Sequence, residues 1–153
     1  MASVIRHASQ RDIAAVARLL HEFNSEFHQP SPGVPWLAER VQSLLEEDVQ
    51  VLVAGDTAPV GVVVMRFREA LWSTGQECYL AELYVTPDER GHGHGRRLML
   101  AAMQVARQRG AVTMDLGTAH DDVAARSLYE SLGFRNTDSP TGGSVNYFYE
   151  REL

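Results

Sequence analysis

The sequence predicts an α/β protein with three layers, in which helices cover both faces of a mixed β-sheet. Two observations lead to this prediction. Segments typical of each type follow one another as strand, two helices, three strands, helix, strand, helix, strand, and such a mixture favours helices packed on both faces of one sheet. No stretch with the composition of a linker interrupts the 153 residues. We therefore expect a single domain over residues 1–153.

Local signals place the elements along the chain. Ser9 with Asp12 approximates a capping box at the start of the first helix, and Pro35 suits the first residue of the second. The expected helices run from Ser9 to about Phe27, from Pro35 to Leu45, from about Gly95 to Arg109, and between Asp121 and Gly133. The expected strands are 2–7, 51–54, 60–68, 79–85, 112–117 and the aromatic segment 144–151. Residues 69–78, which include Trp72 and Cys78, are expected to form a loop.

The composition excludes several classes of protein. Hydrophobic residues make up 44% and charged residues 22% of the chain, as in an ordinary globular protein. The net charge of −6 argues against nucleic-acid binding, which needs a basic face to displace counterions. No apolar run approaches the roughly 20 residues of a membrane span. The single cysteine, Cys78, cannot form an internal disulfide, so we expect a cytoplasmic protein without a membrane partner.

A glycine-rich bend lies between the strand-like segment 79–85 and the helix that follows. Its three glycines are Gly91, Gly93 and Gly95, with arginine on both sides at Arg90 and Arg96. Glycines at the start of a helix let backbone N–H groups turn toward a ligand, and the positive end of the helix dipole attracts an anion. The pattern predicts a phosphate-binding loop.

Three kinds of phosphate-binding loop can be compared with this bend. A P-loop requires a lysine, and the sequence contains none. A dinucleotide-binding turn requires Gly-x-Gly-x-x-Gly directly after the strand. Here Arg96 occupies the position of the third glycine, and five residues separate the end of the strand-like segment, Val85, from Gly91. A third pattern, Arg/Gln-x-x-Gly-x-Gly/Ala, is matched at every fixed position by residues 90–95.

At this loop the sequence resembles the acyl-coenzyme A binding segment of the GNAT superfamily of N-acetyltransferases. A second signature of that family, Asn-x-x-Ala-x-x-Leu-Tyr-Glu-x-x-Gly-Phe, is matched by residues 122–134, with Asp122 at the position where Asn is usual. The two signatures occur in the family's order, and the resemblance covers residues 79–134. It implies a three-layer α-β-α GNAT fold, with a mixed, mostly antiparallel sheet whose two central strands splay apart.

The resemblance also implies an activity, the transfer of an acetyl group from acetyl-CoA to a primary amine by direct attack in a ternary complex. Unpaired backbone groups of residues 83–85 would bind the pantetheine arm like an added strand. The N–H of Leu83 or Tyr84 would stabilise the oxyanion. The cofactor-binding residues implied are Leu83, Tyr84, Val85, Arg90, Gly91, His92, Gly93, His94, Gly95, Arg96, Asp122 and Tyr129.

Two side chains are candidates for acid–base chemistry. Glu82, in the central strand, would accept the proton that the amine must lose, through a water molecule. A bulge in the strand would change its direction, so Glu82 can equally be an exposed or ion-paired carboxylate. Tyr129 matches the family's tyrosine beside the sulfur and would return a proton to the thiolate. The alternative for Tyr129 is an aromatic residue that packs within its helix.

Histidine and cysteine provide no further site in the sequence. His92 and His94 could chelate a metal ion, but no nearby acid or cysteine completes a set of ligands, so we expect no metal. Cys78 as a nucleophile would require a Cys/His/Asn arrangement that the sequence does not offer.

The acceptor side has the weaker signals. The candidate acceptor regions contain acids and aromatics that together could hold a cationic amine by charge and cation–π contact. These residues are Glu22, Glu26, His28, Trp36, Trp72, Tyr147 and Tyr149. Glu22 and Glu26 are four residues apart, so they can equally line a solvated helix face. The aromatic C-terminal segment would suit a homodimer interface.

Two other functions compete with acetyl transfer. A non-catalytic acyl-CoA sensor or regulatory module would keep the loop without turnover. A pyridine-nucleotide-binding module would need the loop spacing that this sequence lacks.

Overall fold

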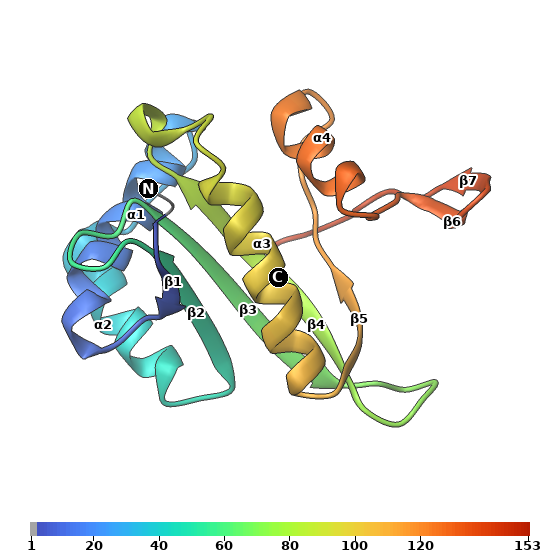
Figure 1. The fold of residues 1–153 in the computed structure, drawn as a ribbon, viewed down its shortest axis with the longest axis horizontal. Helices are drawn as coiled ribbons and strands as arrows, with labels where there is room; N and C mark the ends of the chain where they lie inside the picture. Colours follow the sequence, from blue (N-terminus) through green and yellow to red (C-terminus); the bar gives the residue numbers. More distant parts are fainter. Residues whose placement is uncertain (1–2) are drawn as a thin grey trace. The chain divides into compact units, whose positions relative to one another are not determined.

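The computed structural model describes residues 3–153 (Figure 1). The chain divides into two units, of which the first ends at Leu116 and the second begins at Gly117. The first unit contains β1 (Ile5–His7), α1 (Ile13–Glu26), α2 (Val34–Leu45), β2 (Val49–Ala54), β3 (Gly61–Glu69), β4 (Gln76–Val85), α3 (His94–Gln108) and β5 (Ala111–Asp115). The second contains α4 (Val123–Ser131), β6 (Thr137–Ser139) and β7 (Gly142–Val145).

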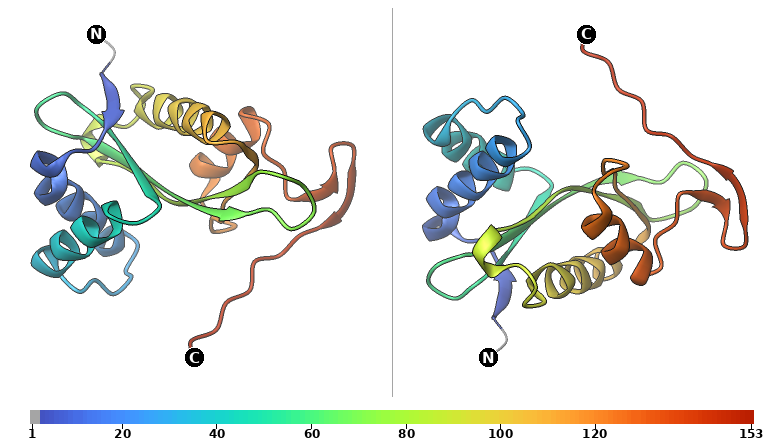
Figure 2. Two further views of the ribbon diagram at one scale, coloured as in Figure 1. Left: turned by 90° about the horizontal axis from the view of Figure 1, so that it is seen from below. Right: turned by 90° about the horizontal axis from the view of Figure 1, so that it is seen from above.

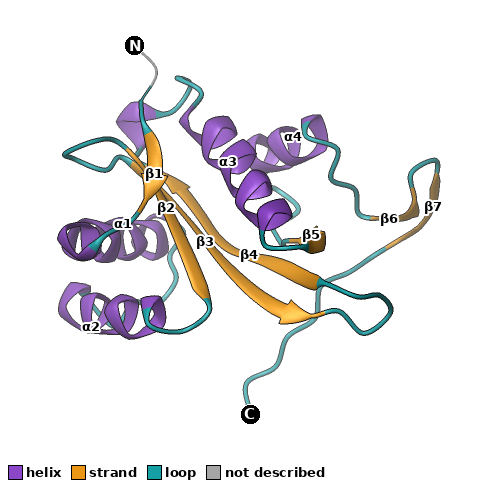
Figure 3. Ribbon diagram, turned by 60° about the horizontal axis from the view of Figure 1, so that its bottom comes forward, coloured by secondary structure: helices purple, strands orange, loops and turns teal. Residues whose placement is uncertain are grey.

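The first unit is built on a five-stranded sheet in the order β1-β2-β3-β4-β5. The neighbours are antiparallel except for β4 and β5, which are parallel. Helices α1 and α2 lie together on one face, and α3 lies on the other (Figures 2 and 3). The expected three-layer arrangement with a mixed, mostly antiparallel sheet is therefore confirmed.

Alternation along the strands sorts the core into two halves. Val62 and Val64 of β3 belong to a buried cluster with residues of α1 and α2. Gly61 and Val63, which alternate with them, face the other side, because successive side chains of a strand point to opposite faces. At Gly61, a Cβ atom would lie 3.0 Å from the side chain of Leu98, which identifies that side as the α3 face.

Strand β4 contains a β-bulge at the centre of the sheet. Met65 of β3 pairs with Leu80, but Val64 pairs with Glu82, so Ala81 is an extra residue in the ladder. An inserted residue shifts the alternation of the strand beyond it by one. Because Glu82 lies opposite Val64, its side chain points to the face covered by α1 and α2.

The capping box predicted at Ser9 forms around a buried carboxylate. The Ser9 backbone N–H donates to Asp12 Oδ2 at 2.8 Å, and Arg6 Nη1 donates to the same oxygen at 2.7 Å. The hydrogen bond from Arg6 holds the pKa of Asp12 well below its usual range, against the opposing effect of burial. The contact ties β1 to the start of α1.

We expect Asp12→Asn to lower the free energy of unfolding by about 3 kcal/mol at pH 7, because it leaves the Arg6 guanidinium without its charge partner. The lowered pKa means that this stabilisation is present above pH ~4 and is lost as the pH falls below it. Urea denaturation at pH 7 and pH 3 measures both effects. Asp56→Asn, which removes an exposed carboxylate 4.0 Å from Arg11, is the matched control and should change stability little.

Several expected boundaries need correction. Strand β4 begins at Gln76, so Cys78 lies in the strand and not in a loop. The first strand, expected over residues 2–7, begins at Ile5, and residue 2 of that expectation lies outside the described part.

No helix within residues 3–153 is both long and apolar enough to cross a membrane.

The aromatic strand expected over residues 144–151 is wrong. Only residues up to Val145 form a strand, β7, which pairs with β6 in a two-stranded hairpin. Beyond it, the Asn146 N–H donates to the Asn136 carbonyl at 2.7 Å, and residues 146–153 have no regular structure. A strand needs a partner for its backbone groups, and within residues 117–153 the sheet contains β6 and β7 alone.

Candidate active site

The side of β4 that faces β5 is open along half its length. The parallel pairing of β4 with β5 runs from Gln76 to Tyr79, whose partner is Asp115, whereas β4 continues to Val85. No strand in residues 3–153 pairs with residues 80–85 on that side. The central strands therefore splay apart, as expected.

The amide directions of this open edge follow from one hydrogen bond. The Thr86 N–H donates to the Val60 carbonyl at 2.9 Å, on the β3 side of the strand. Because amides alternate in direction along an antiparallel ladder, the Tyr84 N–H points to β3, and those of Leu83 and Val85 point to the open side. The edge thus presents two backbone donors that an extended ligand could use.

The glycine-rich bend follows this edge at once. A 3-10 helix, Pro87–Glu89, leads into it, and Gly91 and Gly93 adopt left-handed conformations with φ of 80° and 84°. Gly93 is the N-cap of α3, so the first N–H groups of that helix have no partner within it. No atom lies within 4 Å of where a Cβ of Gly91 would be. The bend offers backbone donors beside open space, which suits an anion.

Arg97 adds a further donor to the same place. Its Nη2 donates to the His92 carbonyl at 3.2 Å. Its Nε is buried and has no hydrogen-bond partner among residues 3–153. The guanidinium of this α3 residue is held against the loop, and its positive charge favours a phosphate group there.

Glu82 lies in a pocket on the α1 and α2 face of the sheet. The pocket has a volume of about 270 Å³. Its lining residues come from α1, α2, β2, β3 and β4, and they are Leu20, Asn24, Trp36, Leu37, Arg40, Val41, Leu44, Val49, Val51, Val64, Arg66, Ala81 and Glu82. Burial raises the pKa of Glu82, and Arg66 partly opposes this. A carboxylate with a raised pKa in a pocket is typical of a general base.

The fold and these features agree with the comparisons to known proteins. The sequence profile of the acetyltransferase (GNAT) family matches residues 13–134. The chain belongs to the GNAT family. It is accordingly an N-acetyltransferase, and acetyl-CoA is the acetyl donor that GNAT enzymes generally use.

Two relatives and one solved structure show the extent of the similarity. The uncharacterized N-acetyltransferase YhfO of Bacillus subtilis (strain 168) is 30% identical over 132 residues, 85% of this chain and 88% of that protein. The thialysine N-epsilon-acetyltransferase of Sus scrofa is 28% identical and covers 93% of this chain and 90% of its own length. A protein of Arthrobacter sp. FB24 assigned as an acetyltransferase superposes with a TM-score of 0.88 at 43% identity, covering 98% and 96% of the two chains.

One connection in this GNAT site was not visible in the sequence. Arg90 Nη2 donates to Glu26 Oε1 at 2.8 Å, and the Tyr84 hydroxyl donates to the same oxygen at 3.1 Å. The Arg90 Nε also donates to the Val85 carbonyl at 3.0 Å. These contacts fasten the glycine loop and the end of β4 to α1. Glu26 is 64 residues from Arg90, so no local pattern could have indicated the pair.

The network shifts the ionisation of its members. The hydrogen bond from Arg90 has the largest effect on the pKa of Glu26, and it lowers that pKa. Burial, followed by the hydrogen bond to Glu26, raises the pKa of Tyr84 to about 12. Glu26 therefore stays charged and Tyr84 protonated at neutral pH, which preserves the contact.

The structure brings an acid to the two loop histidines, which corrects the expectation that none is near. Ligand atoms of Glu89, His92 and His94 all lie within 4.8 Å of one another. Arg97 Nη2, which can only donate, is 3.3 Å from His94 Nδ1, so Nδ1 is the acceptor and Nε2 carries the proton. His94 Nε2 then donates to Glu89 Oε2 at 3.3 Å. This arrangement explains the cluster without a metal ion.

We expect ZnCl2 to leave the melting temperature unchanged relative to EDTA, because the Arg97 guanidinium repels a dication and His94 Nε2 is protonated. Thermal denaturation in the two buffers measures it. A zinc-dependent rise that disappears in His92→Ala, whose side chain is exposed, would contradict the expectation.

Most of the acceptor residues proposed from the sequence do not line the pocket of Glu82. Glu22 lies 3.7 Å from Arg18 on the surface of α1. Trp72 is 93% exposed in the turn between β3 and β4, at the end of β4 opposite the glycine loop. Neither lines the pocket of Glu82. Trp36 of α2, also proposed from the sequence, does line it, together with residues such as Arg66 of β3 that the sequence did not single out.

The second unit carries the second family signature. Asp122 is the N-cap of α4, where its Oδ1 accepts from the Ala125 N–H at 3.1 Å. Aspartate caps a helix as well as asparagine does, which accounts for the substitution in the signature. Tyr129 is buried on α4 and its ring lies 6.1 Å from that of Phe134. Tyr147 also belongs to this unit and is exposed.

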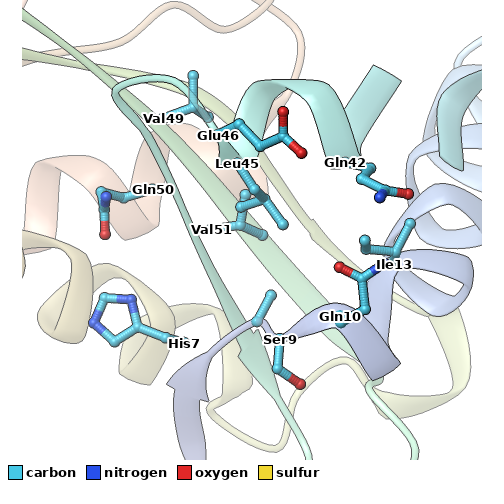
Figure 4. Close-up of a pocket in the computed structure, with 11 residues that line it drawn as sticks. His7, Ser9, Gln10, Ile13, Gln42, Leu45, Glu46, Val49, Gln50 and Val51 are labelled. Atoms are coloured by element: carbon cyan, nitrogen blue, oxygen red, sulfur yellow. The ribbon is translucent and has the colours of Figure 1, made fainter. Parts of the chain in front are cut away.

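Two further features of the first unit lie apart from this chemistry. Burial raises the pKa of the Cys78 thiol to about 11, which makes it a poor nucleophile at neutral pH. A second cavity, of about 370 Å³, lies among β1, α1, α2 and β2. The side chains drawn around it, such as His7, Gln42 and Glu46, include none from β4 (Figure 4).

Proposed function

We propose that this GNAT enzyme transfers the acetyl group of acetyl-CoA to a small primary amine by direct attack in a ternary complex. The observation that carries the proposal is the open edge of β4 over residues 80–85, which leads directly into the glycine loop. The Glu82 pocket adjoins the same segment of β4. One strand segment would therefore serve the acetyl donor at its edge and the acceptor on its face.

The chain's own groups suit acetyl-CoA. The N–H groups of residues 91–95 and the Arg97 side chain would hold the diphosphate, with Arg90 fastening the loop to α1. The open-side amides of Leu83 and Val85 would bind the pantetheine arm and the thioester. Amide direction favours Leu83 over Tyr84 as the donor to the thioester oxygen.

The reaction needs two proton transfers and the stabilisation of an oxyanion. Glu82 would take a proton from the ammonium, through a water molecule, so that the nitrogen lone pair can attack the carbonyl carbon. The Leu83 N–H would stabilise the oxyanion while the carbon–sulfur bond breaks. Tyr129 is proposed to give a proton to the leaving thiolate, and Asp122 to lie near the cofactor as the resemblance implies.

Two measurements test the proposal together. Acetyl-CoA should raise the melting temperature, whereas a reduced nicotinamide nucleotide should not. Free thiol should be released when a panel of primary amines is added. A thermal shift without turnover of any amine would favour an acyl-CoA sensor, and a flat melting curve with acetyl-CoA would contradict cofactor binding altogether.

The oligomeric state and the cellular location of the enzyme are also proposals. Tyr147, Phe148 and Tyr149 are all exposed, which supports a homodimer through the C-terminal segment. Replacing the two tyrosines by serine should then lower the mass measured by light scattering to that of one chain. The single, buried Cys78 supports a cytoplasmic location, which cell fractionation would test.

A further inference from the structure

The pocket of Glu82 combines an apolar interior with an unusual set of charges. Its apolar walls come from α1 and α2, and its floor from the valines of β2 and β3. Three charged side chains line it, and they are Arg40, Arg66 and Glu82. Two positive groups thus accompany one carboxylate. A site built for a simple cation would have the opposite balance.

Arg66 shares the face and the surroundings of Glu82. It pairs with Val49 of β2, a member of the cluster beneath α1 and α2, so it points to that face. It lies two residues from Val64, which pairs with Glu82. The guanidinium is close enough to Glu82 to oppose the effect of burial on that carboxylate.

Arg40 and Arg66 are exposed, and within residues 3–153 they lack the carboxylate partner that several other arginines of the first unit have. Arg6, Arg68 and Arg90 each donate to a carboxylate, at 2.7, 2.6 and 2.8 Å respectively. Within residues 3–153, neither Arg40 nor Arg66 makes a side-chain hydrogen bond or an ion pair. Two unpaired guanidinium groups at one pocket are suited to binding a carboxylate, for which their planar donors have the right geometry.

Size limits the ligand further. Pockets for small molecules usually measure roughly 300–1,000 Å³, and this one measures about 270 Å³. A compact molecule fits such a space. The half-exposed indole of Trp36 lies at the same pocket and would cover an aliphatic chain.

We infer that the acceptor is a small amino acid-like molecule, which carries a carboxylate held by Arg40 and Arg66 and a primary amine that faces Glu82. This inference rests on the proposed acetyl transfer and specifies its acceptor. The carboxylate of the ligand would satisfy the two arginines. Its amine would lie beside the one carboxylate of the pocket.

Matched acceptors test the inference directly. Thiol release is measured for lysine against cadaverine, ornithine against putrescine, and lysine against lysinamide, with acetyl-CoA saturating. We expect kcat/KM to be at least tenfold higher for the member that has a carboxylate. In Arg66→Gln, KM for that member should rise about 10- to 100-fold, so that the preference for lysine over cadaverine shrinks.

Two controls separate the possible failures. Arg68→Gln removes an arginine from the same strand that is bound to Glu77 outside the pocket, and it should leave the carboxylate preference unchanged. A retained melting-temperature shift with acetyl-CoA shows that Arg66→Gln is folded and binds the donor. Preferential turnover of the polyamines, or an unchanged preference in Arg66→Gln, overturns the inference and leaves acetyl transfer standing. If the wild type shows neither a melting-temperature shift with acetyl-CoA nor turnover of any amine, both the proposed acetyl transfer and the inferred acceptor are contradicted.

Discussion

Glu82→Gln is expected to lower kcat by about 10²- to 10⁴-fold, the usual contribution of a general base. The amide has nearly the shape of the carboxylate but cannot accept the amine's proton. The measurement is steady-state thiol release at saturating acetyl-CoA with an amine found active in the panel. The acetyl-CoA thermal shift should persist, because the open edge of β4 and the glycine loop are unchanged.

The pH dependence of the activity tests the role of Glu82 as the base independently. Burial raises the pKa of Glu82, so in the wild type activity should disappear as the pH falls through a value above that of an ordinary glutamate. Below that value the side chain is protonated and cannot act as a base. The Gln variant should lack this contribution to the acidic limb of the profile.

Glu77→Gln is the matched control for Glu82. It removes another glutamate from β4, one that binds Arg68 at 2.6 Å and lies outside the pocket. This variant should retain wild-type kcat within a few fold. If Glu82→Gln retains activity to the same extent, Glu82 is not the base.

Gly93→Glu is expected to abolish the thermal shift produced by acetyl-CoA. At a hundredfold excess over Kd, a ligand stabilises the folded state by about 2.7 kcal/mol, which corresponds to roughly 5–10 °C for a protein of this size. The new carboxylate would stand beside the N-terminus of α3, where we place the diphosphate. It would also meet Arg97, whose Nη1 lies 2.8 Å from the position of a Cβ at residue 93.

Backbone strain must be separated from charge in this test. Gly93 has φ of 84°, so any side chain there strains the loop. Gly93→Ala shares the strain without the charge and should keep part of the shift. Gly110→Ala introduces a side chain at the same φ of 84° after α3, away from the loop, and should lower the melting temperature without affecting the shift. A full shift in Gly93→Glu would mean that the diphosphate binds elsewhere.

The features predicted correctly from the sequence are local ones. The bend at residues 90–95 contains Gly91 and Gly93 at positions whose φ is positive, and the 3-10 turn before α1 carries a capping box that spans four residues, Ser9 to Asp12. For helices and sheet strands with a clear apolar period, the predicted bounds lie within a few residues of the observed ones. In each case the residues that determine the structure lie close together in the chain.

The tertiary structure decided what depends on distant partners. The side of the sheet to which Glu82 points follows from the bulge at Ala81, which exists only in the pairing with β3. The end of the last strand at Val145 follows from the length of its partner β6. The fastening of Arg90 to Glu26 and the two arginines beside Glu82 join segments far apart in sequence. The loop for the acetyl donor could therefore be predicted from the sequence, whereas the acceptor pocket could be recognised only in the folded chain, because its residues come from five separate elements.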